Sequence, residues 1–523
     1  MNILMVAAEN DALEGAKVGG IADVVRDIAP ALAVRGHQIH VVVPGYHSLS
    51  DQAGSQLIGS FQVSFASNSE SIALYQVPGR SAVSGVTQWV LQHHLFAAEG
   101  RGRVYHDDPP DRPFATDATK FALFCTAVAE AIKLNFFNSL DVIHLHDWHA
   151  SCVALLRAYH SRYLSLGSIR LVYSIHNLAL QGIRPFDGDI SAVHAWFPGI
   201  SIDYDQVRDP RYADCINLMR VGINLSDAVH AVSPTYVKEI TRPSNHALGF
   251  FGGEGLESDL LRAEAHGRLS GILNGAEYPS VEASEMLYGH DNTREALLLE
   301  IEDSLLSWVA KSPSVYPGHT LALGRIAQWL RTVSNKEMLL TSVGRLTDQK
   351  VLLLRQAMAD GLSLLDHLLL KMKGRGRLIL LGSGDAKLEQ FLLDVAGRHS
   401  HFLFLRGFSI DMSQSLYHAG DLFLMPSSFE PCGISQMLAM RAGQPCLVHA
   451  VGGLADTVED EITGFSFTGN SLSSQCDALL ETAERAFTKF NEPVQWQTIS
   501  ENASSKRFLW SEAAARYELE LYA

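Results

Sequence analysis

The 523-residue sequence lacks long hydrophobic runs. No uninterrupted apolar stretch approaches the ~20 residues that a helix needs to cross a bilayer, so we expect no membrane-spanning segment. The apolar segment at residues 1–8 is not preceded by basic residues, and Glu9 follows it directly. This segment therefore fits a buried first strand better than a signal peptide.

Cysteines and basic residues are also few. The six cysteines are scattered without CxxC spacing, which in so long a chain indicates reduced thiols and a cytoplasmic protein rather than a disulfide framework. The 41 Lys and Arg residues are outnumbered by 57 Asp and Glu residues, which gives a formal net charge of -16. Binding to nucleic acids or to anionic membranes relies on basic surface, so we expect neither partner. An anionic substrate would have to be held by a local cluster of cations.

Short apolar strands alternate with amphipathic helices in the first half of the sequence. Strands are expected at residues 3–8, 37–44, 141–146 and 171–175, and helices at 22–35 and 114–134. Residues 44–104 alternate more like an antiparallel insertion. This rhythm predicts a mostly parallel sheet with helices on both faces.

The same alternation restarts in the second half. Strands are expected at residues 338–343, 377–381, 402–405, 421–425 and 445–449. A stretch rich in glycine and turn-forming residues, 267–279, separates the halves, so we place a domain boundary near residue 270. The sequence thus predicts an α/β protein with two Rossmann-like domains.

One motif occurs in both halves. Residues 18–24 (VGGIADV) resemble residues 451–458 (VGGLADTV), and each copy follows an expected strand and opens an expected helix. A glycine pair lets the backbone approach a ligand closely, and the N–H groups at a helix start favour an anion. Two ordinary strand-to-helix turns are the alternative, but the near-identity of the copies favours two ligand-binding loops. Such loops would face each other if two Rossmann-like domains packed across a cleft.

Three cations stand beside loops of this kind. Arg345 and Lys350 follow the expected strand at 338–343, and both can reach one pyrophosphate across a strand-to-helix turn. Lys17 precedes the first glycine pair and is a candidate contact for a phosphate or carboxylate. An exposed cationic loop is the alternative for each of them.

A carboxylate opens another expected helix. Glu430 lies in FEPCGISQ (429–436), after the expected strand at 421–425. From a helix N-terminus it could accept hydrogen bonds from sugar hydroxyls, although a plain helix-start acid is the alternative. Cys432 fits a packing residue better than a nucleophile, because the sequence offers no base for it.

Histidines lie at or near the ends of two more of the expected strands. His176 could donate to a substrate oxygen, or could be a structural histidine. His144, His146 and His149 surround Asp147 and raise the option of a metal site. We favour instead a strand end at which Asp147 caps the next helix and binds a hydroxyl.

Taken together, these segments resemble the bacterial glycogen synthase and plant starch synthase family. The matching segments keep the family's order over nearly the whole chain. They are KVGGIADV (17–24), YHDD (105–108), HLHDWHA (144–150), HNLALQG (176–182), AVSPTYVKEI (231–240), GRLSGILNG (267–275), GRLTDQK (344–350), GSGD (382–385), FEPCGISQ (429–436), GGLADTV (452–458) and TGFSF (463–467).

The resemblance implies a retaining glycosyltransferase of the GT-B type, with two Rossmann-like domains facing a deep cleft. The N-terminal domain, on the acceptor side, would span residues 1–268, and the donor-side domain residues 269–505. A helix at 506–523 would cross back to the first domain. The implied reaction transfers glucose from a nucleotide-glucose, usually ADP-glucose in bacteria, to the non-reducing end of an α-1,4-glucan. No cofactor or metal is implied, because protein cations would carry the charge of the leaving group.

The resemblance also implies roles for single residues. Arg345 and Lys350 would neutralise the departing diphosphate, and Glu430 would hold hydroxyls of the donor glucose. The other implied contacts to the donor are Lys17, Gly19 and Gly20 at its diphosphate, the backbone of Cys432 and Gly433, the turn formed by Gly453, Leu454 and Thr457, His176 and Asp147 on the glucose side, and Asn274 near the domain junction.

The sequence departs from the family at several positions. After Asn274 and Gly275 the family continues with an aspartate and a Trp-Asn-Pro segment, where this chain has residues 276–279 (AEYP). The usual Gly-Tyr-Asp/Glu is GFS at 407–409. Two alternatives therefore stand beside a glycogen synthase: a glucosyltransferase that uses UDP-glucose or another acceptor, and a catalytically weakened glycan-binding or regulatory homologue. The joint presence of Lys17, His176, Arg345, Lys350 and Glu430 argues against the weakened homologue.

Overall fold

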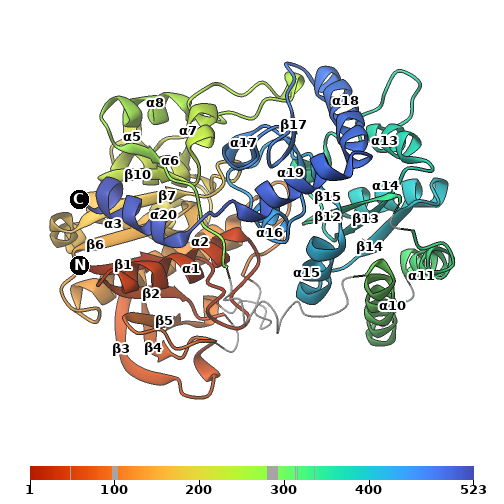
Figure 1. The fold of residues 1–523 in the computed structure, drawn as a ribbon. Coiled ribbons are helices and arrows are strands. Elements are labelled where there is room, and N and C mark those ends of the chain that lie inside the picture. The colour runs from red at the N-terminus through yellow and green to blue at the C-terminus, as the bar shows by residue number, and fades with distance from the viewer. Residues whose placement is uncertain (47–48, 97–103, 279–292, 313, 315, 335) are drawn as a thin grey trace. The chain divides into compact units, whose positions relative to one another are not determined.

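The computed structural model describes residues 1–46, 49–96, 104–278, 293–312, 314, 316–334 and 336–523. The chain forms two compact units. Figure 1 colours the ribbon by residue number, from red at the N-terminus to blue at the C-terminus. Unit 1 comprises residues 1–244, 252–275 and 509–523, and unit 2 comprises residues 245–251 and 276–508. Of the family departure at residues 276–279, the last residue lies outside the described part.

Unit 1 is built on a nine-stranded sheet with the order β11-β10-β7-β6-β1-β2-β5-β4-β3. Its strands are β1 (Asn2–Val6), β2 (Gln38–Pro44), β3 (Gln56–Phe65), β4 (Asn68–Val77), β5 (Val86–Gln92), β6 (Val142–His146), β7 (Arg170–Ile175), β10 (Ala228–Ala231) and β11 (Leu269–Gly271). The seven strands from β11 to β5 run parallel, and β4 and β3 continue the sheet antiparallel. The expected antiparallel insertion is thus confirmed for β3 and β4, whereas β5 joins the parallel sheet. The expected domain division after residue 268 falls just before β11, which pairs with β10, so unit 1 continues to Gly275.

Unit 2 contains a six-stranded, wholly parallel sheet with the order β14-β13-β12-β15-β16-β17. Its strands are β12 (Met338–Val343), β13 (Gly376–Gly382), β14 (Phe402–Arg406), β15 (Leu422–Met425), β16 (Cys446–His449) and β17 (Gly464–Phe467). Numbered along the chain, this is the 3-2-1-4-5-6 order of the Rossmann fold. The strand order reverses between β12 and β15, and ligands of such sheets bind at the carboxyl ends of the strands beside that reversal.

Helices cover both sheets. Unit 1 has α1 (Gly20–Val34), α2 (Ala115–Lys133), α3 (Cys152–Tyr159), α4 (Val193–Trp196), α5 (Tyr204–Val207), α6 (Leu218–Leu225), α7 (Pro234–Ile240), α8 (Glu257–Ala265) and α20 (Trp510–Arg516), and a two-stranded sheet of β8 (Ile183–Pro185) and β9 (Cys215–Asn217). Unit 2 has α10 (Arg294–Lys311), α11 (Pro317–Leu330), α12 (Asp348–Val351), α13 (Leu364–Met372), α14 (Ala386–Arg398), α15 (Ile410–Ala419), α16 (Ser435–Arg441), α17 (Gly452–Thr457), α18 (Leu472–Phe490) and α19 (Pro493–Ser505). Among the described residues, no helix combines the length and apolar character needed to cross a membrane.

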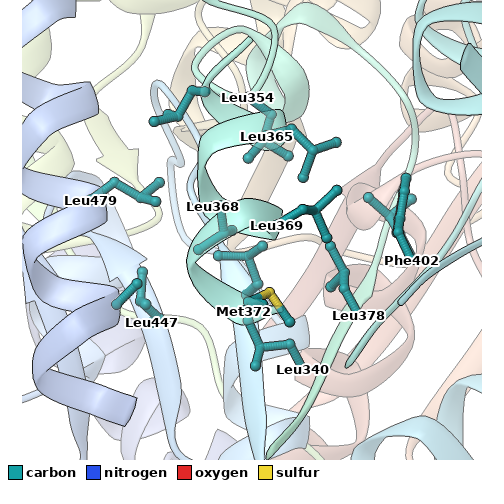
Figure 2. Packing of buried hydrophobic residues seen from close by; sticks show 14 of the residues in the cluster. Leu340, Leu354, Leu365, Leu368, Leu369, Met372, Leu378, Phe402, Leu447 and Leu479 are labelled. Atoms are coloured by element: carbon teal, nitrogen blue, oxygen red, sulfur yellow. The ribbon is translucent and has the colours of Figure 1, made fainter. Parts of the chain in front are cut away.

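The core of unit 2 gathers around α13 (Figure 2). Leucines recur on one face of this helix, and Leu368 and Leu369 are completely buried. They pack with Leu340 of β12, Leu378 of β13 and Phe402 of β14. Because burial of one such side chain contributes about 1.5–3 kcal/mol, this cluster holds the strands that carry the candidate site in fixed register.

The C-terminal segment belongs to unit 1. Trp510 and Tyr517 share a buried cluster with Ile3 and Met5 of β1 and with Ile28 of α1. This return of the last helix to the first unit confirms the expectation from the sequence.

Candidate active site

A lysine and a glutamate meet at the reversal of strand order in unit 2. Lys350 follows β12 and Glu430 follows β15, and the Lys350 ammonium donates a hydrogen bond to Oε2 of Glu430. The Ser427 hydroxyl donates to the same oxygen at 3.0 Å. The glutamate side chain is only 9% exposed and the lysine side chain 26%. The pair therefore gives a nearly buried carboxyl group a cationic partner at the edge where a Rossmann sheet binds its ligand.

Arg345 lies five residues before Lys350, in the loop between β12 and α12. It is exposed and makes no ion pair with any residue that the structure describes. The neighbouring Leu346 pairs with Gly384, and a Cβ atom on Gly384 would lie 2.2 Å from the Leu346 carbonyl oxygen. The ends of β12 and β13 thus approach closely here, and Arg345 presents a cation that is not paired with any carboxylate in the described part of the chain.

The second glycine pair packs against the glutamate segment. Gly453 donates its N–H to the Glu430 carbonyl oxygen at 3.0 Å, and a Cβ atom on Gly453 would lie 2.1 Å from the Cys432 carbonyl oxygen. Gly452 has a φ of +43° and would place a Cβ atom 1.9 Å from the Glu430 carbonyl oxygen. Glycine is therefore required at both positions for close backbone approach. The Gly453 amide, expected to face an anion, is used within the protein.

Gln436 joins the two segments, a role that the sequence analysis missed. Its side-chain amide donates to the carbonyl oxygens of Cys432 at 3.1 Å and Gly433 at 3.0 Å, and to the Thr457 hydroxyl at 3.3 Å. Thr457 in turn donates to the Gly453 carbonyl oxygen at 2.7 Å. The only signal for Gln436 in the sequence was its place at the end of the FEPCGISQ motif (429–436). The structure thus gathers the predicted residues Lys350, Glu430, Cys432, Gly433, Gly453 and Thr457, and the neighbouring Leu454 is completely buried.

In unit 1, the first glycine pair is held by Glu9, which the sequence analysis did not single out. Val18 and Gly19 both donate their N–H groups to Oε2 of Glu9 at 2.5 Å. The Tyr105 hydroxyl donates to the other oxygen at 2.6 Å. Gly20 opens α1, as expected, but two amides just before the helix already serve a carboxylate of the chain itself. The position of Glu9 directly after the first strand was its only signal.

Lys17 sits among acidic side chains. Its ammonium lies 2.6 Å from Asp23 and 3.1 Å from Asp11. Arg26 and Arg80 also contact Asp11. The Lys17 side chain is 36% exposed, so it remains accessible at the edge of this charged cluster.

Asp147 follows β6, beside the place where the strand order of unit 1 reverses. It has a φ of +54° and accepts the His176 backbone N–H at 2.7 Å. Its side chain does not cap the turn at Trp148–Ala150, so the expected helix cap is wrong. The carboxyl group faces the loop after β7 instead. Burial, reinforced by the nearby Glu9 charge, raises the pKa of Asp147 to about 7.

His176 follows β7 and contacts a second buried histidine. Its Nε2 lies 2.9 Å from Nδ1 of His146. Burial, with smaller effects from neighbouring histidines, lowers the pKa of both rings well below the usual value, so both are neutral at physiological pH. Both ring nitrogens of His144 are bonded, to Tyr522 and Ser174. No group of three or more His, Cys, Asp or Glu side chains in the described part of the chain is arranged to hold a metal ion.

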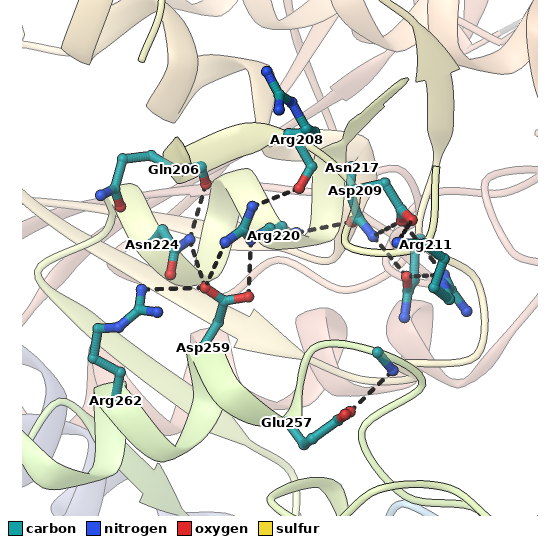
Figure 3. Close-up of polar contacts among 12 residues, drawn as sticks. Gln206, Arg208, Asp209, Arg211, Asn217, Arg220, Asn224, Glu257, Asp259 and Arg262 are labelled. Carbon is teal, nitrogen blue, oxygen red and sulfur yellow. Dashed lines mark hydrogen bonds and ion pairs between the residues drawn. The ribbon is translucent and has the colours of Figure 1, made fainter. Parts of the chain in front are cut away.

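A polar network holds the loop that carries His176. Arg211 and Asn217 each donate to Oε1 of Gln181 at 2.6 Å, and Asn217 also donates to Asp209 at 2.7 Å. Figure 3 shows Asp209, Arg211 and Asn217 converging. Gln181 also donates to the Leu178 carbonyl oxygen, which closes the loop on itself. The loop after β7 is therefore fixed by buried hydrogen bonds.

The same figure shows a second cluster, centred on Asp259 of α8 (Figure 3). Asp259 binds Arg220 of α6 through both of its oxygens, at 2.8 and 3.1 Å, and also accepts from Asn224 and Arg262. This bidentate pair fastens α8 to α6.

Asn274 lies just before the chain leaves unit 1. It is 5% exposed, and its Oδ1 atom has no hydrogen-bond partner among the described residues. A Cβ atom on the next residue, Gly275, would meet the Trp510 backbone nitrogen at 2.6 Å. An unpaired buried amide oxygen is costly in a native protein, which makes Asn274 a candidate ligand contact.

Two protein families match the chain. The starch synthase catalytic domain matches residues 2–262, and the family described as glycosyl transferases group 1 matches residues 337–485. The chain is 32% identical to a glycogen synthase of Streptococcus agalactiae, over 100% of this chain and 99% of that protein. It is 30% identical to a glycogen synthase of Desulfitobacterium hafniense, over 96% and 95%.

Solved structures show the same fold. The catalytic domain of starch synthase IV from Arabidopsis thaliana, bound to ADP and acarbose, matches with a TM-score of 0.74 and 25% identity, over 100% of this chain and 98% of that one. Sucrose-phosphate synthase from Thermosynechococcus elongatus matches with a TM-score of 0.54 and 15% identity, over 99% and 97%, a likeness of fold alone. The GT-B fold class expected from the sequence is thereby confirmed.

Proposed function

Because this chain belongs to the glycogen synthase and starch synthase family of glycosyltransferases, we propose that it transfers glucose from ADP-glucose to the non-reducing end of an α-1,4-glucan with retention of configuration. The observation that carries the proposal is the Lys350–Glu430 pair at the strand reversal of unit 2, with the exposed Arg345 in the loop that leads to Lys350. The names of the relatives, and the ADP and acarbose bound to the plant enzyme, support a nucleotide-sugar donor and a glucan acceptor.

On the donor side, Arg345 and Lys350 stabilise the diphosphate as it leaves. Negative charge develops on the leaving oxygen in the transition state, and placed cations in a partly buried site stabilise it. Glu430 accepts hydrogen bonds from glucose hydroxyls and keeps Lys350 in place. Gln436 holds the Cys432–Gly433 backbone against Thr457, so the protein's own hydrogen bonds fix this part of the proposed donor site.

Residues of unit 1 serve the same reaction. Lys17 and the Gly19–Gly20 loop act on the donor diphosphate, and Asp147 and His176 on the glucose. The unpaired Oδ1 of Asn274 accepts a further hydrogen bond. Asp11 and Asp23 hold the Lys17 ammonium in place until the donor diphosphate, which carries more negative charge, takes over this contact.

Retention proceeds by attack from the face on which the diphosphate leaves. Retaining hydrolases use one carboxylate as nucleophile and another as acid. Here Glu430 is already paired with Lys350, and Asp147 has a pKa near neutrality and is bonded to the backbone of His176. The acceptor hydroxyl oxygen therefore bonds to the anomeric carbon as the bond to the phosphate oxygen breaks. A phosphate oxygen takes the hydroxyl proton.

The proposal includes no cofactor or metal, because the nucleotide-glucose is a substrate and Lys17, Arg345 and Lys350 supply the positive charge. A cytoplasmic location stays a prediction.

The proposal is tested by incubating the purified protein with glycogen and either ADP-glucose or UDP-glucose, and measuring nucleotide release and chain growth. Growth with ADP-glucose that is digestible by an enzyme specific for α-1,4 links supports the proposal. Growth only with UDP-glucose would change the donor assignment. Absence of turnover with both donors would favour a glycan-binding homologue.

A further inference from the structure

The proton positions of the buried histidines in unit 1 follow from their hydrogen-bond partners. A neutral imidazole carries one N–H donor and one acceptor nitrogen, and which nitrogen is protonated is decided by the groups it faces. His144, His146, His176 and His230 are all buried, and burial lowers the pKa of each. Each ring is therefore neutral and carries one proton, either on Nδ1 or on Nε2.

The direction of one hydrogen-bond chain is fixed by a backbone carbonyl. Nε2 of His230 faces the Ile272 carbonyl oxygen at 3.1 Å, and a carbonyl only accepts, so the His230 proton is on Nε2. Nδ1 of His230 then accepts from the Ser174 hydroxyl at 2.8 Å. The Ser174 oxygen accepts from Nε2 of His144 at 2.7 Å, and Nδ1 of His144 accepts from the Tyr522 hydroxyl at 2.8 Å.

His146 stands next to this chain but outside it. Its ring stacks on His144, with ring centres 4.5 Å apart and an angle of 17° between the planes. Its Nδ1 faces Nε2 of His176 at 2.9 Å, and its Nε2 is buried without a partner among the described residues. Only one hydrogen bond therefore decides how the protons of His146 and His176 are placed.

Two arrangements satisfy that hydrogen bond, and they differ in what they leave unpaired. If His176 donated, the His146 proton would be on Nε2, which would be a buried N–H without an acceptor. If His146 donates from Nδ1, its Nε2 is only an unused acceptor. Orphaned buried N–H groups are rare in native proteins, and unused acceptors are less so.

We propose that His146 is a positioning residue, which donates its Nδ1–H to Nε2 of His176 and so keeps the His176 proton on Nδ1, as a donor to a substrate hydroxyl. Nδ1 of His176 has no hydrogen-bond partner in the described part of the chain. The sequence analysis considered His146 only as a metal ligand. This inference rests on the proposed function, because that function identifies the substrate as a sugar and the hydroxyl as a sugar hydroxyl.

Variants of His146 separate this role from simple packing. The side-chain amide of Asn places an N–H group where the imidazole has Nδ1, whereas Phe keeps an aromatic ring and offers no donor. His146→Phe should lower kcat about 10- to 100-fold, as loss of an orienting partner does at other sites, with the KM for the donor unchanged. His146→Asn should restore most of the kcat lost in the Phe variant.

His40→Asn is the matched control. His40 is also a buried histidine of the same sheet, and it accepts from Trp89 Nε1 at 3.0 Å through Nδ1, which the Asn oxygen can replace. This variant should keep the kcat of the unchanged protein. A kcat that is as low in His146→Asn as in His146→Phe would overturn the proposal.

A spectroscopic readout makes the test independent of activity. In ¹⁵N-histidine-labelled protein without substrates, the protonated and unprotonated ring nitrogens of His176 give well-separated resonances, assigned by their loss in His176→Gln. We expect the proton on Nδ1 in the unchanged protein and in His146→Asn, and redistribution to Nε2 in His146→Phe. A proton on Nε2 of His176 in the unchanged protein would refute the proposal. If the protein failed to extend glucan, the proposed function would fall while this tautomer assignment would still be decided.

Discussion

The Lys350 ammonium is hydrogen-bonded to Oε2 of Glu430, and the two residues follow β12 and β15, the strands on either side of the strand-order reversal in unit 2. The carboxyl group is nearly buried, so removal of the lysine takes away its cationic partner and leaves the Ser427 hydroxyl as its donor. The same ammonium is a proposed ligand of the leaving diphosphate. In the proposed reaction, one cation thus both orders the site and supplies charge to the leaving group.

Substitution of Lys350 should therefore remove most turnover. We expect Lys350→Met to lower kcat about 100-fold or more, because it removes charge from the leaving group in the transition state. The double variant Lys350→Met/Glu430→Gln should be little worse than the single variants, since residues that act as a unit are non-additive.

Lys371→Met is the control for that experiment. Lys371 lies in α13 of the same unit, 3.9 Å from Glu484, and both side chains are about 40% exposed. It should keep normal kcat. Near-normal turnover in Lys350→Met would contradict the role assigned to Lys350.

The two glycine loops should respond differently to an added methyl group. A Cβ atom on Gly453 would lie 2.1 Å from the Cys432 carbonyl oxygen, whereas one on Gly20 meets nothing within 4 Å. Gly453→Ala should cost about 1–3 kcal/mol of stability and displace the Glu430 segment, which lowers kcat. Gly20→Ala, at the first position of α1, should keep or raise the thermal midpoint. Equal effects on the two thermal midpoints would contradict the close approach that is present at Gly453 and absent at Gly20.

Glu9 should matter for donor binding although it contacts no substrate in the proposal. Glu9→Gln replaces one acceptor oxygen by an NH₂ group, so the Val18 and Gly19 amides and the Tyr105 hydroxyl can no longer all be paired. We expect a higher KM for the donor, measured in initial-rate assays. Glu14→Gln, at an exposed position nearby, should leave that KM unchanged. If Glu9→Gln and Glu14→Gln had the same KM for the donor, the proposed effect of Glu9 on donor binding through the Val18–Gly19 backbone would be contradicted.

Stability should depend on pH through Asp147. Burial raises its pKa from 3.8 to about 7, so the folded state holds the proton more tightly than the unfolded state. Its contribution to stability is fully present below the unfolded pKa and is lost as the pH rises through the folded pKa. The Asn side chain of Asp147→Asn cannot ionise. Between pH 3.8 and about 7, the free energy of unfolding of this variant should therefore rise relative to that of the unchanged protein by about 1.4 kcal/mol per pH unit. Urea unfolding across the interval measures this difference, and a difference independent of pH would contradict the shifted pKa.

Activity should not depend on a metal. The proposed reaction uses Lys17, Arg345 and Lys350 for the charge of the diphosphate, so dialysis against a chelator should leave the initial rate unchanged. Loss of activity that added Mg²⁺ or Mn²⁺ restores would show that these cations are not sufficient.

Of the strands, β8 to β11 and β17 were not foreseen, and β3 to β5 were expected only as an alternating insertion, but the others could be predicted to within about two residues. β12, for example, spans Met338–Val343, as the apolar run bounded by Gly344 indicated. The helices α10 and α11, in contrast, were not foreseen, although Leu297, Ile301 and Leu305 recur every four residues along a buried face. That spacing predicts a helix, although the segment carries none of the family motifs.

The site could be predicted only in part, because sequence motifs identify residues but not their partners. Lys350 and Glu430 lie 80 positions apart in the sequence, and only the strand order brings them into contact. Glu9 was missed because one carboxylate after a strand has no distinctive pattern. Asp147 was identified as a helix cap for lack of any signal that its carboxyl group would face the His176 backbone N–H instead.

The central claim is tested most directly by one measurement, the stoichiometry of ADP release and glucose incorporation when the purified protein acts on glycogen with radiolabelled ADP-glucose. The account predicts one glucose added in α-1,4 linkage for each ADP released, with both rates abolished together in Lys350→Met. Release of ADP without growth of the glucan, or no turnover of ADP-glucose, would contradict it.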